Sequence, residues 1–176
     1  MVLHFLIPMS GEYPVKAIEL IQKALAFSQG MINNYLSDLS DDDILVRPVP
    51  TANNIAWQIG HLTASEIMMV KEQIPSAVYP ELPASLKEYA SGKSATTVTS
   101  FLKKADYLEW FNKVRAATIE NVGKLTESDL DKATVGNMKD FCPKVGEILN
   151  LITVHDMMHG GQFTVVRRAA GKPVLM

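Results

Sequence analysis

The sequence predicts an all-α protein, a four-helix bundle with irregular connectors. Four long segments repeat apolar residues at three- and four-residue intervals, which is the spacing of one face of an α-helix. A faint internal repeat supports two helix pairs: residues 36–44 resemble residues 122–130, and each of these segments closes one long helix and precedes a connector and another helix. Two such pairs packed together would give a four-helix bundle.

Length and composition indicate one globular domain over residues 1–176, with an apolar strap at residues 1–14 lying over the bundle. The chain has 176 residues, of which 47% are hydrophobic, enough for a proper core. His4 lies in the strap, where a packed or exposed histidine is a better interpretation than a ligand. The first nine residues lack the basic leader and cleavage site of a signal peptide, and no apolar run approaches the length of a membrane span.

Charge and cysteine content restrict the function classes. The net charge is −2 and acidic and basic residues are mixed, so neither a nucleic-acid surface nor a membrane-binding basic patch is expected. The chain has one cysteine, Cys142, which rules out an internal disulfide. A reducing, cytoplasmic setting is the natural interpretation.

The first two helices are predicted over residues 15–39 and from a start at residues 51–54 to about residue 73. Acidic residues end the first, two prolines make the next connector extended, and Asn54 is among the candidate N-caps of the second. Residues 74–94 contain three prolines and form a long irregular connector, expected to cover one end of the bundle and to form part of a pocket wall. A short helical turn is expected at residues 84–89.

The other two helices are predicted over residues 100–125 and 143–170. The third has a buried stripe that includes Arg115. Residues 131–141 between them fit a small hairpin or a plain loop. The fourth helix starts near Pro143 and ends at Gly171, and its wide apolar arc makes it the most buried of the four.

His155 and His159 lie on this fourth helix, four residues apart and therefore on one face. Two imidazoles so placed can bind one metal ion, although two polar residues on a half-buried face is an equally good interpretation of the pair alone. Apolar neighbours favour a buried pair, which needs partners. Gln162 is expected near the pair as a hydrogen-bonding residue, and Gly160 and Gly161 predict close approach of a neighbouring helix.

His61, in the middle of the second helix, is the expected third ligand. Trp57, His61 and Ser65 share a face, so Trp57 is expected beside the site, although a core role is an equally good interpretation. Three histidines leave coordination positions open for water or substrate, as catalytic rather than structural sites do. The glutamate of the H-E-x-x-H protease motif is missing, which excludes that class.

Other candidates are weaker. Cys142 precedes the start of a helix, which would lower its pKa, but a lone cysteine is more often inert. Asp156 is rotated about 100° from His155, so a salt link or a supporting role is expected. Glu66 is a neighbour of the site histidines in sequence only, and Glu147 is a candidate supporting acid on the face of His155. Arg167 and Arg168 are expected to form a solvated helix end.

Three motifs taken together resemble the DinB/YfiT-like family of metal-dependent four-helix bundles. They are residues 54–62 (NIAWQIGHL), 155–162 (HDMMHGGQ) and 168–173 (RAAGKP). The resemblance covers residues 15–173 and implies an up-down-down-up bundle, a divalent ion of the nickel or zinc type on His61, His155 and His159, and a homodimer. Residues 74–94 and 131–141 match nothing in the family's pattern.

The resemblance also implies a class of function. Members with known roles resemble thiol S-transferases and thiol-dependent isomerases, in which the metal activates a low-molecular-weight thiol, and many members have no assigned reaction. The first hypothesis is therefore a metal-dependent thiol transferase or hydrolase acting on a small molecule. The alternatives are a non-catalytic metal-binding or dimerising bundle, including one with a stress-related role, and a metal-free bundle with three buried histidines.

Overall fold

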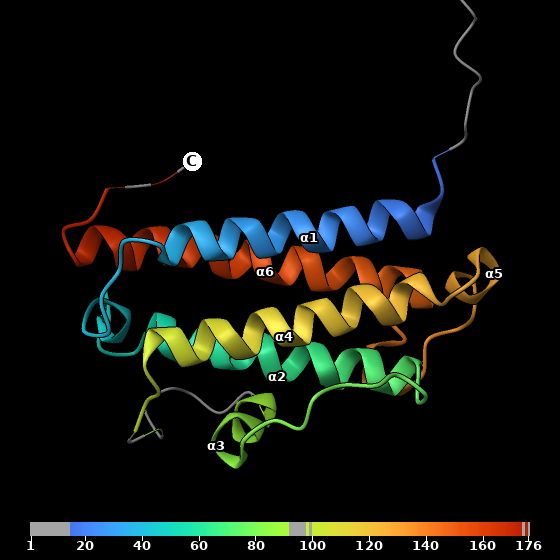
Figure 1. The fold of residues 1–176 in the computed structure, drawn as a ribbon, viewed down its shortest axis with the longest axis horizontal. Helices are drawn as coiled ribbons and strands as arrows, with labels where there is room; N and C mark the ends of the chain where they lie inside the picture. The colour runs from blue at the N-terminus through green and yellow to red at the C-terminus, as the bar shows by residue number, and fades with distance from the viewer. Residues whose placement is uncertain (1–14, 92–97, 99, 174, 176) are drawn as a thin grey trace, which may run out of the picture.

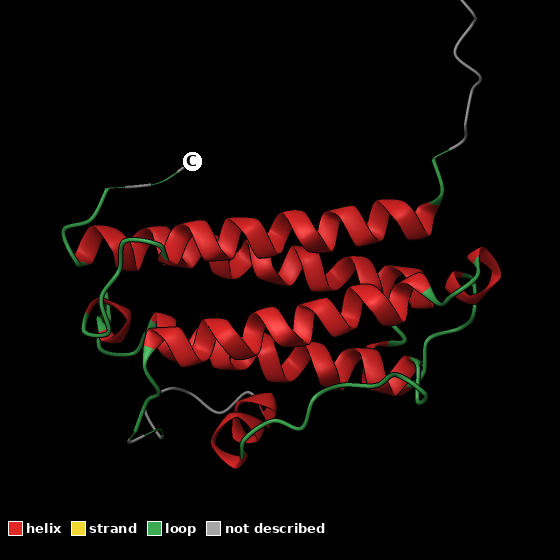
Figure 2. Cartoon of the chain, viewed as in Figure 1, coloured by secondary structure: helices red, strands yellow, loops and turns green. Residues whose placement is uncertain are grey.

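Four long helices form the body of the protein in the computed structural model, which describes residues 15–91, 98, 100–173 and 175 (Figures 1 and 2). These are α1 (Ala17–Leu36), α2 (Ile55–Gln73), α4 (Lys104–Gly123) and α6 (Val145–Ala169). The predicted all-α bundle is confirmed, and each predicted helix is present with ends shifted by a few residues. The strap and His4 lie outside the described residues.

The helices form an up-down-down-up bundle. α1 packs against α4 and α6, and α2 packs against the same two helices, so α1 and α2 stand at opposite corners. In Figure 1, α1 and α6 run in one direction while α2 and α4 run in the other. None of the helices in the described part of the chain is long and apolar enough to cross a membrane.

The core consists of two apolar clusters that follow each other along the bundle axis. The first surrounds Ile59, Phe111 and Phe163, and the second surrounds Leu25 and Ile148. Each long helix contributes to both clusters because its apolar residues recur at helical spacing over four or more turns. Between the clusters every helix turns a polar residue inward, which matters for the site described below.

The start of α2 is fixed by its first residues. The Asn54 side chain accepts a hydrogen bond from the backbone N–H of Trp57 at 2.9 Å, so among the candidate N-caps at residues 51–54 the structure selects Asn54. The cap fixes where the helix begins. Along the helix, Trp57, His61 and Ser65 follow at four-residue steps and share one side, whereas Gln58 is rotated by about 100° from Trp57.

The connectors are irregular, as predicted. Residues 74–91 run back along α2 and include α3 (Ala84–Lys87) and η2 (Glu88–Ser91), so the helical turn expected at 84–89 is present (Figure 1). This segment covers the side of α2, not one end of the bundle. Residues 131–141 form a loop with one isolated β-bridge at Ala133, not a hairpin. The remaining short elements are η1 (Asp43–Leu45), α5 (Glu127–Leu130) and η4 (Gly136–Met138).

Candidate metal centre

The fold brings His61 of α2 together with His155 and His159 of α6. Their potential ligand nitrogens all lie within 4.8 Å of one another, and the three rings meet edge to face, with centroids 4.8–5.6 Å apart. His159 is buried, whereas His61 and His155 are half-buried. The cluster is therefore closed by protein around His159 and partly exposed to solvent at His61 and His155.

Hydrogen bonds assign the ring nitrogens that remain free. His61 Nδ1 lies 3.1 Å from the backbone carbonyl of Tyr89, which can only accept, so Nδ1 carries the proton and Nε2 keeps its lone pair. Gln58 donates through Nε2 to the Asn53 carbonyl at 3.0 Å, which leaves its Oε1 to accept from His159 Nδ1 at 2.8 Å. His159 therefore also presents a free Nε2.

The spacing of the pair on α6 fits a shared ion. His155 Nε2 and His159 Nε2 lie 3.2 Å apart. Two nitrogens bound to one ion at about 2.0–2.1 Å, with tetrahedral or octahedral angles, are themselves about 2.9–3.4 Å apart. Without an ion, His155 Nε2 carries a proton and donates a hydrogen bond to His159 Nε2. The cluster could hold a metal ion, and the backing of two rings by acceptors on Nδ1 is the arrangement that orients metal-binding histidines.

Burial keeps the pair on α6 neutral. Desolvation lowers the pKa of His155 to about 4, with a further contribution from His61. Desolvation likewise lowers the pKa of His159 to about 3, and the other two histidines add to the effect. Both imidazoles are thus uncharged at neutral pH, with one N–H and one nitrogen lone pair each, which is the form that binds metals.

The wall around His61 is built from aromatic rings. Trp57 stacks on His61 with centroids 4.9 Å apart and an interplanar angle of 11°, so it lies beside the histidines as predicted. Tyr89 meets Trp57 edge-on, and its hydroxyl is hydrogen-bonded to Tyr107 at 2.8 Å. Gly60 makes this packing feasible, because its missing side chain leaves room for the Tyr89 ring.

The glycines after His159 behave differently from each other. A Cβ on Gly160 would lie 3.2 Å from Tyr35 of α1, so the predicted close approach is present there. Gly161 has no neighbour within 4 Å, and the prediction is wrong for it. Gln162 is exposed. It lies seven residues after His155, which displaces it from that histidine by about 10 Å along the helix axis. The amide that contacts a histidine is Gln58 instead.

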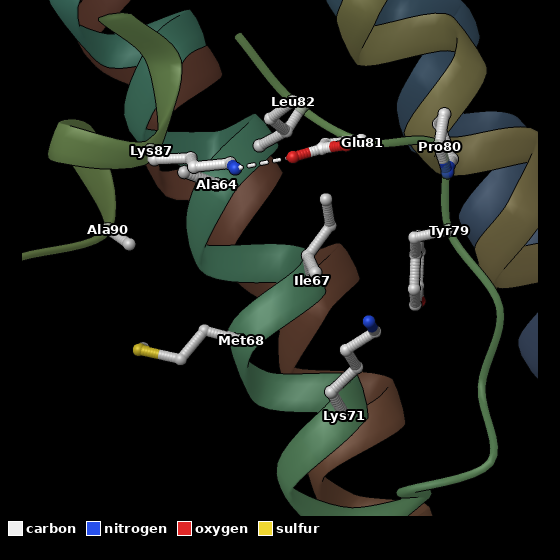
Figure 3. A pocket seen from close by; sticks show the side chains of 10 residues that line it. All are labelled: Ala64, Ile67, Met68, Lys71, Tyr79, Pro80, Glu81, Leu82, Lys87 and Ala90. Atoms are coloured by element: carbon white, nitrogen blue, oxygen red, sulfur yellow. Dashed lines mark hydrogen bonds and ion pairs between the residues drawn. The ribbon is translucent and has the colours of Figure 1, made fainter. Parts of the chain in front are cut away.

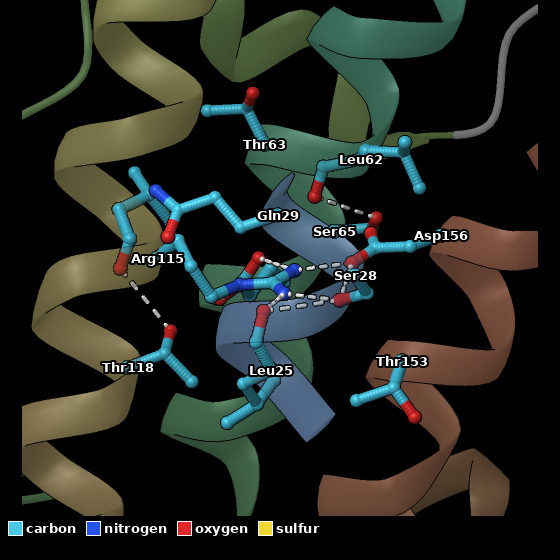
Figure 4. A network of polar contacts seen from close by, with 12 residues as sticks. Leu25, Ser28, Gln29, Leu62, Thr63, Ser65, Arg115, Thr118, Thr153 and Asp156 are labelled. Atoms are coloured by element: carbon cyan, nitrogen blue, oxygen red, sulfur yellow. Dashed lines mark hydrogen bonds and ion pairs between the residues drawn. The ribbon is translucent and has the colours of Figure 1, made fainter. Parts of the chain in front are cut away.

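A buried ion cluster around Arg115 lies between the two apolar clusters. Figure 4 shows its polar contacts, which come from four helices. Arg115 of α4 is fully buried and uses all five N–H groups as donors. The acceptors are Glu66 of α2 (2.9 and 2.8 Å), Asp156 of α6 (2.7 Å), and Ser28 Oγ (2.7 Å) and the Leu25 carbonyl (2.8 Å) of α1.

This ion cluster fixes the helices that carry the histidines. Glu66 lies five residues after His61, and Asp156 directly follows His155, so Arg115 ties together the ligand-bearing parts of α2 and α6. Burial raises the pKa of Asp156 to about 6, Arg115 opposes the rise and Glu66 adds to it. The salt link expected for Asp156 is confirmed, and Glu66, expected to be adjacent in sequence only, belongs to the same cluster.

Cys142 agrees with the interpretation of an inert cysteine, and two weaker candidates differ from the sequence prediction. Burial raises the pKa of Cys142, because the thiol is desolvated in the second apolar cluster, so the lowering that a helix start would give is not present. Glu147 is exposed and caps the start of α6 through the Lys144 backbone. Arg167 is fully buried and pairs with Asp38 at 2.6 Å, so only Arg168 is a solvated helix end.

Sequence reasoning missed Gln58 and the Tyr89 carbonyl. Gln58 lies 101 residues before its partner His159, and nothing in the sequence relates the two. A backbone carbonyl has no sequence signature at all. The one available signal was Gly60 inside a helix, which is costly unless a neighbour needs the space.

Comparisons with known proteins agree with this architecture. A sequence model of the DinB superfamily matches residues 24–163, most of the chain. No curated protein matches the chain. A solved structure with a similar fold is a crystal structure of a conserved protein from Enterococcus faecalis, with a TM-score of 0.64 and 14% identity, covering 90% of this chain and 100% of that one. The extent of the match to the sequence model establishes that this chain belongs to the DinB superfamily.

Proposed function

We propose that the protein is a metal-dependent enzyme of the thiol-transferase or hydrolase kind, with a divalent ion, nickel or zinc, on His61, His155 and His159. The observation that carries the proposal is the convergence of three imidazoles, two of them with Nε2 freed by hydrogen bonds at Nδ1. An ion held by three neutral imidazoles would lower the pKa of a bound water or small thiol, so that it ionises near neutral pH.

The residues around the cluster support catalysis over a closed structural site. Three protein ligands would leave coordination positions open for water or a thiol, and the partial exposure of His61 and His155 supports access from solvent. Trp57 is buried and stacks on His61, which holds that ring in place. Gln58 and the Tyr89 carbonyl hold the rings in one orientation.

The first experiment measures the metal. Protein purified without added metal is analysed by element-resolved mass spectrometry, beside the double variant His155→Ala, His159→Ala. We expect close to one nickel or zinc per chain in the wild type and almost none in the variant. Asn150→Ala, an exposed change on the same helix, is the matched control and should keep the metal. Equally low metal in all three proteins would refute the metal centre.

The second experiment measures the reaction. The protein is assayed with a small thiol plus an alkylating electrophile, and separately with an activated ester in water. Turnover should vanish on chelation and return with zinc or nickel. If the metal is present but neither assay shows turnover above that of the double variant, the non-catalytic metal-binding bundle becomes the better description.

We also propose that the protein is cytoplasmic and forms a homodimer. The single cysteine, buried and unpaired, supports a reducing compartment. The dimer is supported by an exposed apolar face along the neighbouring helices α1 and α6. Its residues, which we call the α1/α6 face, are Leu20, Phe27, Val154, Met158 and Val165, each between 49% and 67% exposed.

A further inference from the structure

A cavity of about 390 Å³ lies between the outer side of α2 and the segment that follows it (Figure 3). Its floor is α2, from Ala64 to Lys71, and its opposite wall is the chain from Tyr79 to Ala90. It shares this wall with the histidine cluster, because Ala90 follows the residue whose carbonyl contacts His61. The histidines are not needed to form it.

The wall of this cavity is held in place before any ligand binds. The Tyr79 hydroxyl is hydrogen-bonded to Thr118 of α4 at 2.8 Å. Asn121 of α4 donates to the Val78 carbonyl at 2.9 Å and accepts from the Val78 N–H at 3.3 Å. Leu82 and Leu86 are buried in the first apolar cluster and anchor the far end of the wall. Such preformed, partly apolar cavities are typical of small-molecule sites.

The polar groups of the cavity leave one positive charge. Lys87 and Glu81 neutralise each other at the rim, with Nζ and Oε1 3.1 Å apart. Lys71 extends its ammonium into the cavity beside Tyr79 (Figure 3). In the described part of the chain Lys71 has no hydrogen-bond or ion-pair partner. The other lining groups are largely apolar, including Ile67, Met68 and Leu82.

We propose that this cavity binds a small carboxylate with an apolar body, with the Lys71 ammonium pairing with the carboxylate. The apolar body lies along Ile67 and Met68, against the Tyr79 ring and Leu82. The charge favours an anion and the walls favour an apolar chain, so the preferred ligand carries both. This site goes beyond the proposed metal chemistry, and its binding does not require an ion at the histidines.

The test compares three probes of equal length, octanoate, octan-1-ol and octylammonium, by isothermal titration calorimetry with a chelator present. We expect octanoate to bind with a Kd of about 0.1–1 mM. The alcohol should bind at least about tenfold more weakly, and octylammonium should not bind. Amide shifts of Ala64 and Ala90 in NMR spectra would locate the ligand in this cavity.

Variants assign the binding to Lys71. Lys71→Met should weaken octanoate binding by about tenfold or more, and Lys71→Arg should retain it. Lys23→Met, an exposed lysine on α1, is the matched control and should change nothing. Octanoate binding should survive in the His155→Ala, His159→Ala variant, which separates this result from that of the metal centre. Two results would overturn the proposal. One is no octanoate binding up to about 10 mM, which would put the Kd above the millimolar range. The other is octanoate binding that Lys71→Met leaves unchanged.

Discussion

Gly60 and Tyr89 are packed so closely that a Cβ on residue 60 would lie 2.9 Å from Cγ of the tyrosine ring. The ring cannot simply swing away, since its hydroxyl is bonded to Tyr107 and its edge packs on Trp57. The backbone carbonyl of the same tyrosine orients His61 at 3.1 Å. A single glycine thus connects the packing of η2 with the geometry of the histidine cluster.

Gly60→Ala is therefore expected to disturb both stability and metal binding. The added methyl group should cost about 1–3 kcal/mol of unfolding free energy through overpacking, measured by urea denaturation. Displacement of Tyr89 should lower zinc affinity by about 10-fold or more, measured by competition with a chelating dye. The control is Gly161→Ala, which has free space around it and should be neutral or stabilising by up to about 1 kcal/mol. Equal behaviour of the two variants would contradict this packing argument.

Gln58 offers a test of ring orientation without a change in the ligands. Gln58→Met keeps the volume but removes the acceptor for His159 Nδ1, and zinc affinity should fall by about 10- to 100-fold. Gln58→Glu retains an acceptor oxygen and should keep most of the affinity. If both variants bind zinc like the wild type, the amide does not orient the histidine.

Arg115 should dominate the stability of the bundle centre. Arg115→Met leaves the Glu66 and Asp156 carboxylates buried without a cation, which should lower the free energy of unfolding by about 3–5 kcal/mol. Lys113→Met is the matched control on the same helix: it breaks an exposed ion pair with Glu109 and should cost about 1 kcal/mol or less. Chemical denaturation of both variants measures the difference, and similar costs would mean that the ion cluster does not hold the helices together.

The metal-free protein should become less stable in acid through His155 and His159. An unfolded imidazole binds a proton below about pH 6.5, whereas in the folded protein these pKa values are about 4 and 3. Between these limits the unfolded chain binds more protons, so the unfolding free energy falls as the pH drops from 6.5 toward 4, by up to about 5 kcal/mol for the two groups together. Above about pH 7.5 the two histidines add no pH dependence.

The comparison protein for this measurement is His155→Gln, His159→Gln, unfolded by urea with a chelator present. Asp156, whose raised pKa acts in the opposite direction, is present in both proteins and largely cancels in the difference. The difference in unfolding free energy between wild type and variant should shrink or reverse as the pH falls. A pH-independent difference would show that the histidines titrate normally in the folded state.

The α1/α6 face should mediate the proposed homodimer. Phe27→Asp combined with Met158→Asp places charges on two of its exposed residues and should convert the dimer to a monomer in sedimentation velocity runs. Phe141→Asp alters an equally exposed aromatic residue away from this face and should leave the dimer intact. A wild-type protein that sediments as a monomer at micromolar concentration would refute the dimer.

The sequence by itself determined the helices and the pair on α6. Apolar spacing located all four long helices, and the candidate caps at residues 51–54 marked the start of α2, because caps and periodicity are local properties. Four-residue spacing placed His155 and His159 on one face. His61 was expected as the third histidine from its place in the middle of another predicted helix, and the motif around it then added the resemblance to a family.

Only the tertiary structure decided what surrounds those histidines. Gln58, the Tyr89 carbonyl and the Arg115 cluster all act across helices, between residues 28–101 positions apart in the chain. It also reversed local expectations: Arg167 is buried although it lies in the last turn of a helix, and Gln162 is exposed although it follows the histidines in helical register. Helical periodicity determines which side of one helix a residue occupies. Which helix faces that side depends on packing across the whole bundle, and no local pattern records it.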